Sequence, residues 1–173
     1  MKQILAVIDM QNDFISGSLG TKEAQSILES VVKAVEDFNG DIFFTRDTHS
    51  ENYLSTNEGK HLPVLHCVKG TSGHELAGKL KELSQSHTVI DKSVFGSTEL
   101  IQRLIESDKS EKIDKITLIG VCTDICVASN ALCLKTFLPE TEICVISSLC
   151  AGTTPENHMH ALEVMKMCQV TVL

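Results

Sequence analysis

The chain has no long hydrophobic run and no cluster of positive charge. Its N-terminal segment MKQILAVID holds only five consecutive apolar residues, whereas a membrane-spanning helix needs about 20 and a signal-peptide core at least about seven. Its 15 lysines and arginines are scattered singly against 23 acidic residues, so nucleic acid and anionic membranes have no basic stripe to bind. These absences exclude nucleic acid and membrane as partners, favour small molecules or proteins, and predict a cytoplasmic location.

Internal repeats and low-complexity segments are also lacking, and 173 residues fit one domain with a sizeable core. We therefore expect a single domain over residues 1–173. Short apolar runs rich in β-branched residues predict strands, and helical spacing of apolar residues predicts helices between them. The expected strands are 4–8, 42–45, 87–90, 116–121, 143–147 and 170–173, and the expected helices are 24–38, 74–83, 98–106, 124–138 and 155–167.

The strand runs show little alternation, which indicates strands buried on both faces, as in a parallel sheet covered by helices. This pattern predicts an α/β fold, a doubly wound three-layer α/β/α sandwich with a mainly parallel six-stranded sheet. In such sheets ligands bind beyond the carboxyl ends of the strands. Three reactive side chains are expected at that edge: Asp9 directly after the first strand, Lys92 two residues beyond the third, and Cys126 after the fourth.

The cysteines do not form a secreted disulfide framework, because their number is odd and several lie in apolar runs where they serve as small hydrophobic residues. They are Cys67, Cys122, Cys126, Cys133, Cys144, Cys150 and Cys168. Cys126 is set apart by its place where a strand passes directly into a helix. If Thr123 or Asp124 caps that helix, the first turn would lower the thiol pKa and make it partly thiolate near neutrality. The backbone amides of Cys122 and Cys126 can then form an oxyanion hole.

Taken singly, these residues also have plain structural explanations: Cys126 as a core residue, Asp9 as a turn residue and Lys92 as a solvated lysine. Taken together, a carboxylate, an ammonium and a thiol make a proton-transfer set for a nucleophilic cysteine. No histidine is expected at a strand end near the cysteine. His158 and His160 are expected on the surface of the last helix.

A second group of polar residues lies in the long segment 46–73, which shows no regular pattern. Asp47 and His49 leave a strand together, and Glu58, His61 and His66 follow. Carboxylate and imidazole ligands of this kind can complete a site for zinc or a related divalent ion, although loop histidines are often simply solvated.

The chain resembles the isochorismatase-like cysteine hydrolases, and within them the nicotinamidases. The resemblance rests on AVIDMQNDF (6–14), TRDTH (45–49), DKSVFGST (91–98) and GVCTDICV (120–127), whose order and spacing cover essentially the whole chain. It implies that nicotinamide is hydrolysed to nicotinate and ammonia through a cysteine thioester, for NAD salvage, with pyrazinamide as a side substrate. It also implies the isochorismatase-like hydrolase fold and a homo-oligomer.

The same resemblance implies roles for individual residues. Cys126 would be the nucleophile, Asp9 the base that later protonates ammonia, and Lys92 the cation that orients both. The amides of Cys122 and Cys126 would hold the oxyanion beside a cis peptide between Val121 and Cys122.

For the metal, the resemblance implies Asp47, His49, Glu58 and His66 as ligands of a divalent ion: zinc, manganese or iron. His61 is the substitute for Glu58, because Ser55 stands where many relatives have another histidine. Phe14 and Phe95 match positions that flank the substrate, with core packing as the alternative.

Three other activities compete with this interpretation. Another carboxamide or ureido amidase would share the cysteine and the acid but not the Asp-x-His pair. A metal-water hydrolase would leave Cys126 incidental. A redox or metal-sensing module built on Cys122 and Cys126 is disfavoured, because their spacing of four differs from a Cys-x-x-Cys pair.

Overall fold

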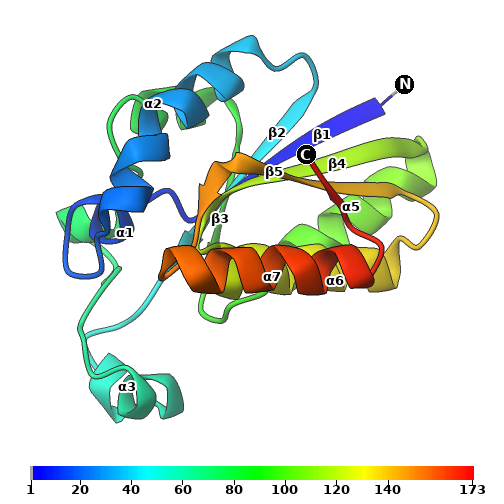
Figure 1. Cartoon of the computed structure of the whole chain (residues 1–173). Coiled ribbons are helices and arrows are strands. Elements are labelled where there is room, and N and C mark those ends of the chain that lie inside the picture. The colour runs from blue at the N-terminus through cyan, green and yellow to red at the C-terminus, as the bar shows by residue number, and fades with distance from the viewer. Residues whose placement is uncertain (1) are drawn as a thin grey trace.

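A six-stranded sheet forms the centre of the molecule in a computed structural model that describes residues 2–173 (Figure 1). The strand order is β3-β2-β1-β4-β5-β6, and every neighbouring pair runs parallel. The predicted α/β fold is confirmed, with a sheet that is entirely rather than mainly parallel. The strands are β1 (Lys2–Ile8), β2 (Asp41–Asp47), β3 (Thr88–Lys92), β4 (Ile113–Val121), β5 (Glu142–Ala151) and β6 (Thr171–Val172).

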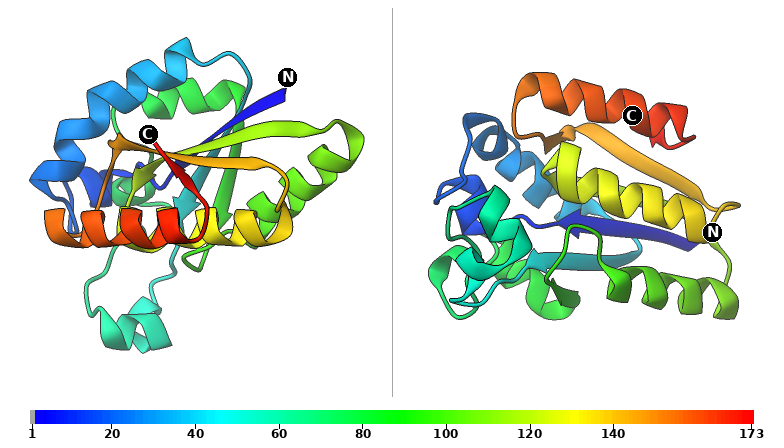
Figure 2. Two further views of the ribbon diagram at one scale, coloured as in Figure 1. Left: turned by 45° about the vertical axis from the view of Figure 1, so that its right-hand side comes forward. Right: turned by 90° about the horizontal axis from the view of Figure 1, so that it is seen from below.

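Helices cover both faces of the sheet. Helix α2 (Lys22–Asp37) lies on one face, and α5 (Thr98–Ser110), α6 (Ala128–Phe137) and α7 (Pro155–Met167) lie side by side on the other (Figure 2). Alternate residues of β1 point to opposite faces, so Ile4, Ala6 and Ile8 pack in the core under α5, α6 and α7. Leu5 and Val7 pack in the core under α2.

The helix predicted over 74–83 is wrong. The chain instead forms a 3₁₀ turn at Ser72–His74 and a single helical turn, α4 (Leu80–Leu83). Between them, residues 75–77 run extended beside the chain after β1, with Asn12 N–H donating to the Glu75 carbonyl and Ala77 N–H to the Met10 carbonyl. This tertiary pairing outweighs the local helical spacing.

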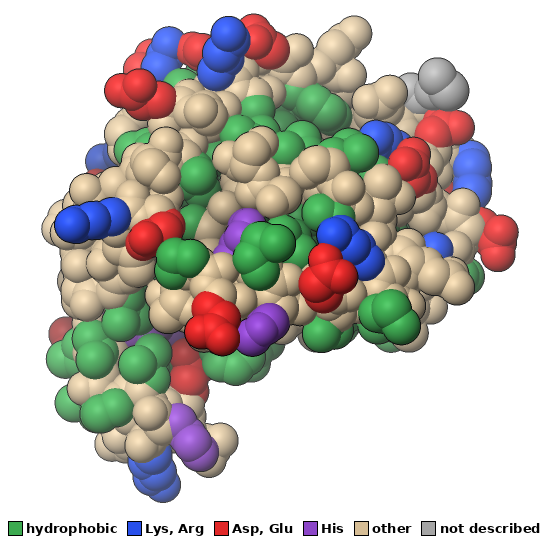
Figure 3. All heavy atoms as spheres, viewed as in Figure 1, with side chains coloured by type: hydrophobic (Ala, Val, Ile, Leu, Met, Phe, Trp, Pro, Cys, Tyr) green, Lys and Arg blue, Asp and Glu red, His purple; other side chains and the backbone are tan. Residues whose placement is uncertain are grey.

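The segment between β2 and β3 extends beyond the body of the sheet, and α3 (Asn57–His61) lies in it (Figure 1). Figure 3 shows hydrophobic side chains gathered on this projection, where Leu54, Leu62 and Leu65 are exposed. The other short elements are α1 (Asn12–Ile15), 3₁₀ turns at Tyr53–Ser55 and Ser84–Ser86, and a π-helical turn at Thr123–Val127. Among residues 2–173, no helix has both the length and the hydrophobicity needed to cross a membrane.

Candidate active site and metal site

Cys126 lies in the π-helical turn that follows β4. The turn begins at Cys122, and the peptide bond between Val121 and Cys122 is cis, as expected. Gly120 makes this end of the strand possible, because its φ is +119° and a side chain there would lie 2.1 Å from the Ile8 carbonyl oxygen. The strand can therefore lie against β1, and the turn begins beside the residue that ends β1.

Asp9, Lys92 and Cys126 meet at this edge of the sheet. Lys92 Nζ lies 2.7 Å from Asp9 Oδ2 and 3.5 Å from Cys126 Sγ. The Asp9 side chain is oriented by Thr45, whose hydroxyl donates to Oδ1 at 2.6 Å. Asp9 has a φ of 48°, a backbone conformation that is uncommon outside glycine and recurs at functional sites. All three charged or nucleophilic residues are at most 5% exposed.

The two carboxylate oxygens of Asp9 have different partners. Oδ1 accepts from the Thr45 hydroxyl at 2.6 Å, whereas Oδ2 is paired with the Lys92 ammonium at 2.7 Å. Burial raises the pKa of Asp9, while Lys92 opposes that shift. Burial alone would lower the pKa of Lys92, but Asp9, Cys126 and Asp47 hold it above its ordinary value. Asp9 is thus a stronger base than an exposed carboxylate, and Lys92 stays cationic.

The predicted low pKa of the Cys126 thiol is wrong. Burial raises this pKa well above its ordinary value, and the charge of Asp9 raises it further, against the opposing effect of Lys92. The thiol is therefore protonated near neutrality before a substrate binds. Formation of the nucleophile requires transfer of its proton to a nearby base.

The predicted cap is also wrong, because neither Thr123 nor Asp124 caps the turn. Its N-terminal residue is Cys122, without a side-chain cap. Thr123 instead pairs through Oγ1 with His158 Nδ1 at 2.8 Å, and Asp124 accepts from the Thr153 backbone at 2.8 Å. His158 therefore packs against the turn that carries the cysteine rather than facing solvent, whereas His160 is exposed.

The structure brings Asp47, His49, Glu58 and His66 together, with one ligand atom from each within 4.8 Å of all the others. Asp47 Oδ2 lies 2.9 Å from His49 Nε2 and 3.5 Å from His66 Nε2, and Glu58 Oε1 lies 3.7 Å from His49 Nε2. Burial would raise the pKa of Asp47, but hydrogen bonds from both histidines and the charge of Lys92 hold it well below its usual range. Two imidazoles and two carboxylates are a donor set suited to zinc, manganese or iron.

The surroundings of His66 also suit a ligand. Its Nδ1 donates to the Val64 carbonyl at 2.8 Å, so Nε2, 3.5 Å from Asp47 Oδ2, is the nitrogen that would give up its proton to bind a metal. His61 lies outside the cluster, and its Nδ1 pairs with the Asn57 carbonyl at 2.8 Å. Of the two residues considered for the extra position, the structure places Glu58 and not His61 with the others.

A cavity of about 490 Å³ connects the two groups of residues. Cys122 and Cys126 line it together with Asp47, Glu58 and His66. Phe14 and Phe95 also line this cavity. Phe14 is 9% exposed with its ring centroid 5.6 Å from that of His66, whereas Phe95 is 45% exposed.

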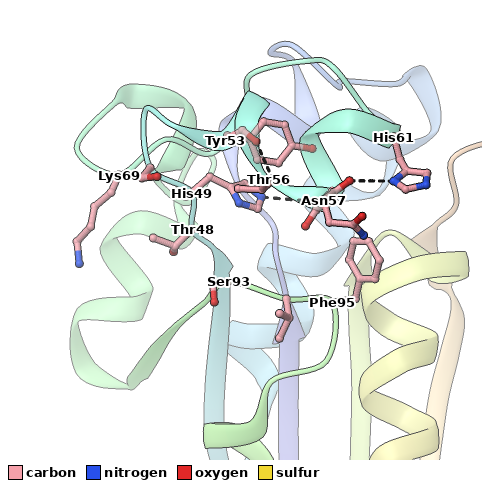
Figure 4. A pocket seen from close by; sticks show the side chains of 12 residues that line it. Thr48, His49, Tyr53, Thr56, Asn57, His61, Lys69, Ser93 and Phe95 are labelled. Carbon is pink, nitrogen blue, oxygen red and sulfur yellow. Dashed lines mark hydrogen bonds and ion pairs between the residues drawn. The ribbon is translucent and has the colours of Figure 1, made fainter.

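A second, more open cavity of about 880 Å³ lies next to the first (Figure 4). Glu58, His61 and Phe95 line both cavities. Figure 4 shows the Phe95 ring opposite Asn57 and His61 at this boundary. Phe95 therefore stands at the mouth of the inner cavity rather than in the core.

Sequence reasoning missed three buried residues that support the site. Gln11 holds Asp47 through two hydrogen bonds, accepting from its N–H at 2.7 Å and donating to its carbonyl at 2.8 Å. Tyr53 is fully buried, and its ring packs on His49 and His66 with centroid distances of 4.5 and 4.8 Å. Thr45 is the third. Gln11 lies in the motif AVIDMQNDF and Thr45 in the motif TRDTH, so their places in these motifs could have indicated a role at the site.

The sequence and the fold of this chain are similar to those of known proteins. The sequence pattern of the isochorismatase domain matches residues 3–173. An uncharacterized isochorismatase family protein of Bacillus subtilis, PncA, is 34% identical over 94% of this chain and 93% of its own length. The pyrazinamidase/nicotinamidase structure from Streptococcus mutans has a TM-score of 0.84 and 31% identity, covering 99% of this chain and 100% of that one. The pyrazinamidase structure from Pyrococcus horikoshii in complex with zinc has a TM-score of 0.84 and 27% identity, covering 100% and 99%.

Proposed function

The chain belongs to the isochorismatase family, and on that premise we propose that it is a nicotinamidase, which hydrolyses nicotinamide to nicotinate and ammonia. The observation that carries the proposal is the Asp9–Lys92–Cys126 arrangement, with Lys92 Nζ 2.7 Å from the carboxylate and 3.5 Å from the sulfur. The thiol and three of the four candidate metal ligands, Asp47, Glu58 and His66, line one cavity. A flat aromatic carboxamide could then present its amide carbon to the sulfur and its ring to the ligand cluster.

The first half of the reaction forms a thioester. Asp9 takes the thiol proton, the sulfur attacks the carboxamide carbon, and the amides of Cys122 and Cys126 stabilise the oxyanion. Asp9 then gives its proton to the nitrogen as the C–N bond breaks, and ammonia leaves. Lys92 stays cationic throughout and offsets the negative charge that moves between the carboxylate and the sulfur.

The second half releases the acid. Asp9, again a carboxylate, accepts a proton from a water molecule that attacks the thioester carbon. The C–S bond breaks, the thiol regains its proton, and nicotinate is released. Both halves use the same carboxylate, whose Oδ2 lies 2.7 Å from the Lys92 ammonium.

Asp47, His49, Glu58 and His66 would hold a divalent ion, and we propose zinc, with manganese and iron as the alternatives. When bound, the ion supplies a Lewis-acid anchor for the pyridine nitrogen. Phe14 and Phe95 would flank the ring of the substrate. Holding both ends of a small, rigid substrate makes the attack by sulfur effectively unimolecular.

We propose one domain over residues 1–173, a homo-oligomer, a cytoplasmic location, and pyrazinamide as a side substrate. Together these describe a small enzyme of NAD salvage.

The decisive experiment is ammonia release from nicotinamide by the parent protein and by Cys126→Ala. We expect kcat to fall by at least about a thousandfold, the scale for removal of a covalent nucleophile. Cys168→Ala is the matched control, because that cysteine is exposed. Zinc content is measured in the same samples. Near-normal turnover by Cys126→Ala, with metal bound, would favour a metal-water hydrolase instead.

A further inference from the structure

Asn130 is a fully buried polar side chain in α6 that the proposed chemistry does not use. Its Oδ1 accepts from the Ser97 backbone N–H at 2.8 Å. Its Nδ2 donates to the carbonyls of Cys126 at 2.8 Å and Phe95 at 3.2 Å. An apolar residue here would leave three backbone groups, two of them in buried hydrogen bonds, without these partners. The amide is therefore suited to one particular arrangement of the surrounding chain.

These bonds join two segments that line the site. One is the π-helical turn that ends beside Cys126, and the other is the loop 93–97 between β3 and α5. The loop lies against α6, since a Cβ at Gly96 would be 3.7 Å from Ser129 Cβ and 3.8 Å from Cys133 Sγ. One nitrogen that bonds both carbonyls fixes the distance between the backbone of the cysteine and the backbone of the loop.

The side chain that this loop presents is Phe95. This residue is 45% exposed and lines both cavities at their boundary (Figure 4). A side chain this exposed is fixed by packing less than a buried one is. Its place over the inner cavity therefore depends on the backbone of the loop, and that backbone is held by Asn130.

We propose that Asn130 is a positioning residue that sets where the Phe95 ring stands relative to the Cys126 thiol, and so how tightly an aromatic carboxamide is held. The identity of the substrate rests on the proposed function, but the positioning of the Phe95 ring by Asn130 does not. Asn130 touches no reacting atom. Its loss should therefore raise KM more than it lowers kcat.

The structural part is tested without any substrate. The chain has no tryptophan, so Phe95→Trp places a single fluorophore on the loop. Acrylamide quenching of this tryptophan is compared with and without Asn130→Asp. The aspartate keeps the acceptor for Ser97 and removes both donors, in a side chain of nearly the same shape. We expect quenching to rise at least roughly twofold as the loop loosens.

The functional part is tested by a double-mutant cycle on nicotinamide hydrolysis. Asn130→Ala should raise KM about tenfold and change kcat by less than about threefold. In a Phe95→Ala background the same substitution should change KM by less than about twofold, because the ring it positions is gone. Thr136→Ala is the control on the same helix, since its exposed hydroxyl donates to the Leu132 carbonyl one turn earlier in α6.

Two results would overturn the inference: unchanged quenching in folded Asn130→Asp, or an equal KM effect with and without Phe95. Circular dichroism and thermal melting establish which variants are folded, and Asn130→Asp replaces Asn130→Ala in the cycle if the alanine variant is not. A parent protein that releases no ammonia from nicotinamide would refute the proposed function. The quenching comparison would then decide the role of Asn130 by itself.

Discussion

At the scale of single residues, the site is organised around one buried ammonium. Lys92 Nζ is shared by Asp9 at 2.7 Å and Asp47 at 3.4 Å, so it links the carboxylate beside the thiol to the carboxylate of the candidate metal cluster. The two strands explain this link, because Asp47 and Lys92 are register partners at the ends of β2 and β3. Neutralising either carboxylate should therefore change the electrostatic environment of the other group of residues.

Asp9→Asn separates the proton-transfer role of this residue from its structural role. The asparagine can still accept the Thr45 hydroxyl, but it cannot take the proton of a thiol whose own pKa is raised. We expect kcat for ammonia release to fall by about 10² to 10⁴, the range for loss of a general base. Asp41→Asn, at the exposed start of β2, should leave kcat unchanged. Full activity in Asp9→Asn would mean that another group accepts the proton.

The sequence was enough to predict which reactive residues meet, but not the protonation state of the thiol. Asp9, Lys92 and Cys126 were predicted to converge because strand ends meet at one edge of a parallel sheet. The thiol pKa was predicted with the wrong sign, since the depth of burial around a turn depends on packing by α7 and on the segment after β2. Asn130 could have been noticed, because it interrupts the apolar positions Val127, Ala131 and Leu134 on one helical face.

At the scale of elements, helix α3 brings Glu58 to the residues that leave the sheet at the end of β2. Thr56 begins this short helix, with its hydroxyl accepting from Gly59 N–H at 3.0 Å. Glu58 and His61 are both in α3, yet only Glu58 lies with Asp47, His49 and His66. The orientation of one helical turn thus selects between two possible ligands.

Zinc affinity should distinguish Glu58 from His61. We expect Glu58→Gln to weaken zinc binding by more than about tenfold, because it removes a charged ligand, and His61→Ala to change it by less than about twofold. Competition with a chromogenic chelator measures both affinities without reference to activity. The reverse pattern, with zinc lost from His61→Ala and kept by Glu58→Gln, would show that α3 rotates when metal binds.

Regular elements were predictable where local pattern and tertiary packing agree. The predicted helix 155–167 matches α7, which begins with a Thr154 cap and Pro155 in its first turn. The prediction over 74–83 failed because Gly78 adopts a φ of +52° and the preceding residues pair with the chain after β1. Long-range pairing of that kind leaves no periodic signal in the sequence.

At the scale of the whole molecule, the fold buries most of the cysteines away from solvent. All seven are free, as the predicted absence of a disulfide framework requires. Burial raises the pKa of Cys122 and of Cys150 to about 12. In the unfolded chain both thiols have an ordinary pKa near 8.5, so between about pH 9 and 12 the folded state binds more protons than the unfolded state. Stability is therefore complete below the unfolded pKa and is lost as pH rises through this window.

Cys150→Ala should make the protein less sensitive to alkali. Urea unfolding under reducing conditions gives the free energy of unfolding at pH 8 and at pH 10. Because the buried thiol must stay protonated while its unfolded counterpart ionises, we expect the drop between these pH values to be about 2 kcal/mol smaller in Cys150→Ala than in the parent. The small cavity left by the substitution lowers stability equally at both pH values and cancels from the comparison. Cys168→Ala, at an exposed position, should behave as the parent does. An unchanged drop in Cys150→Ala would contradict the raised pKa, because it would mean that this thiol ionises in the folded protein as readily as in water. Cys150 lies in β5 beside Gly120 of β4 and is buried in the core under α5, α6 and α7, where ionisation would require the core to open.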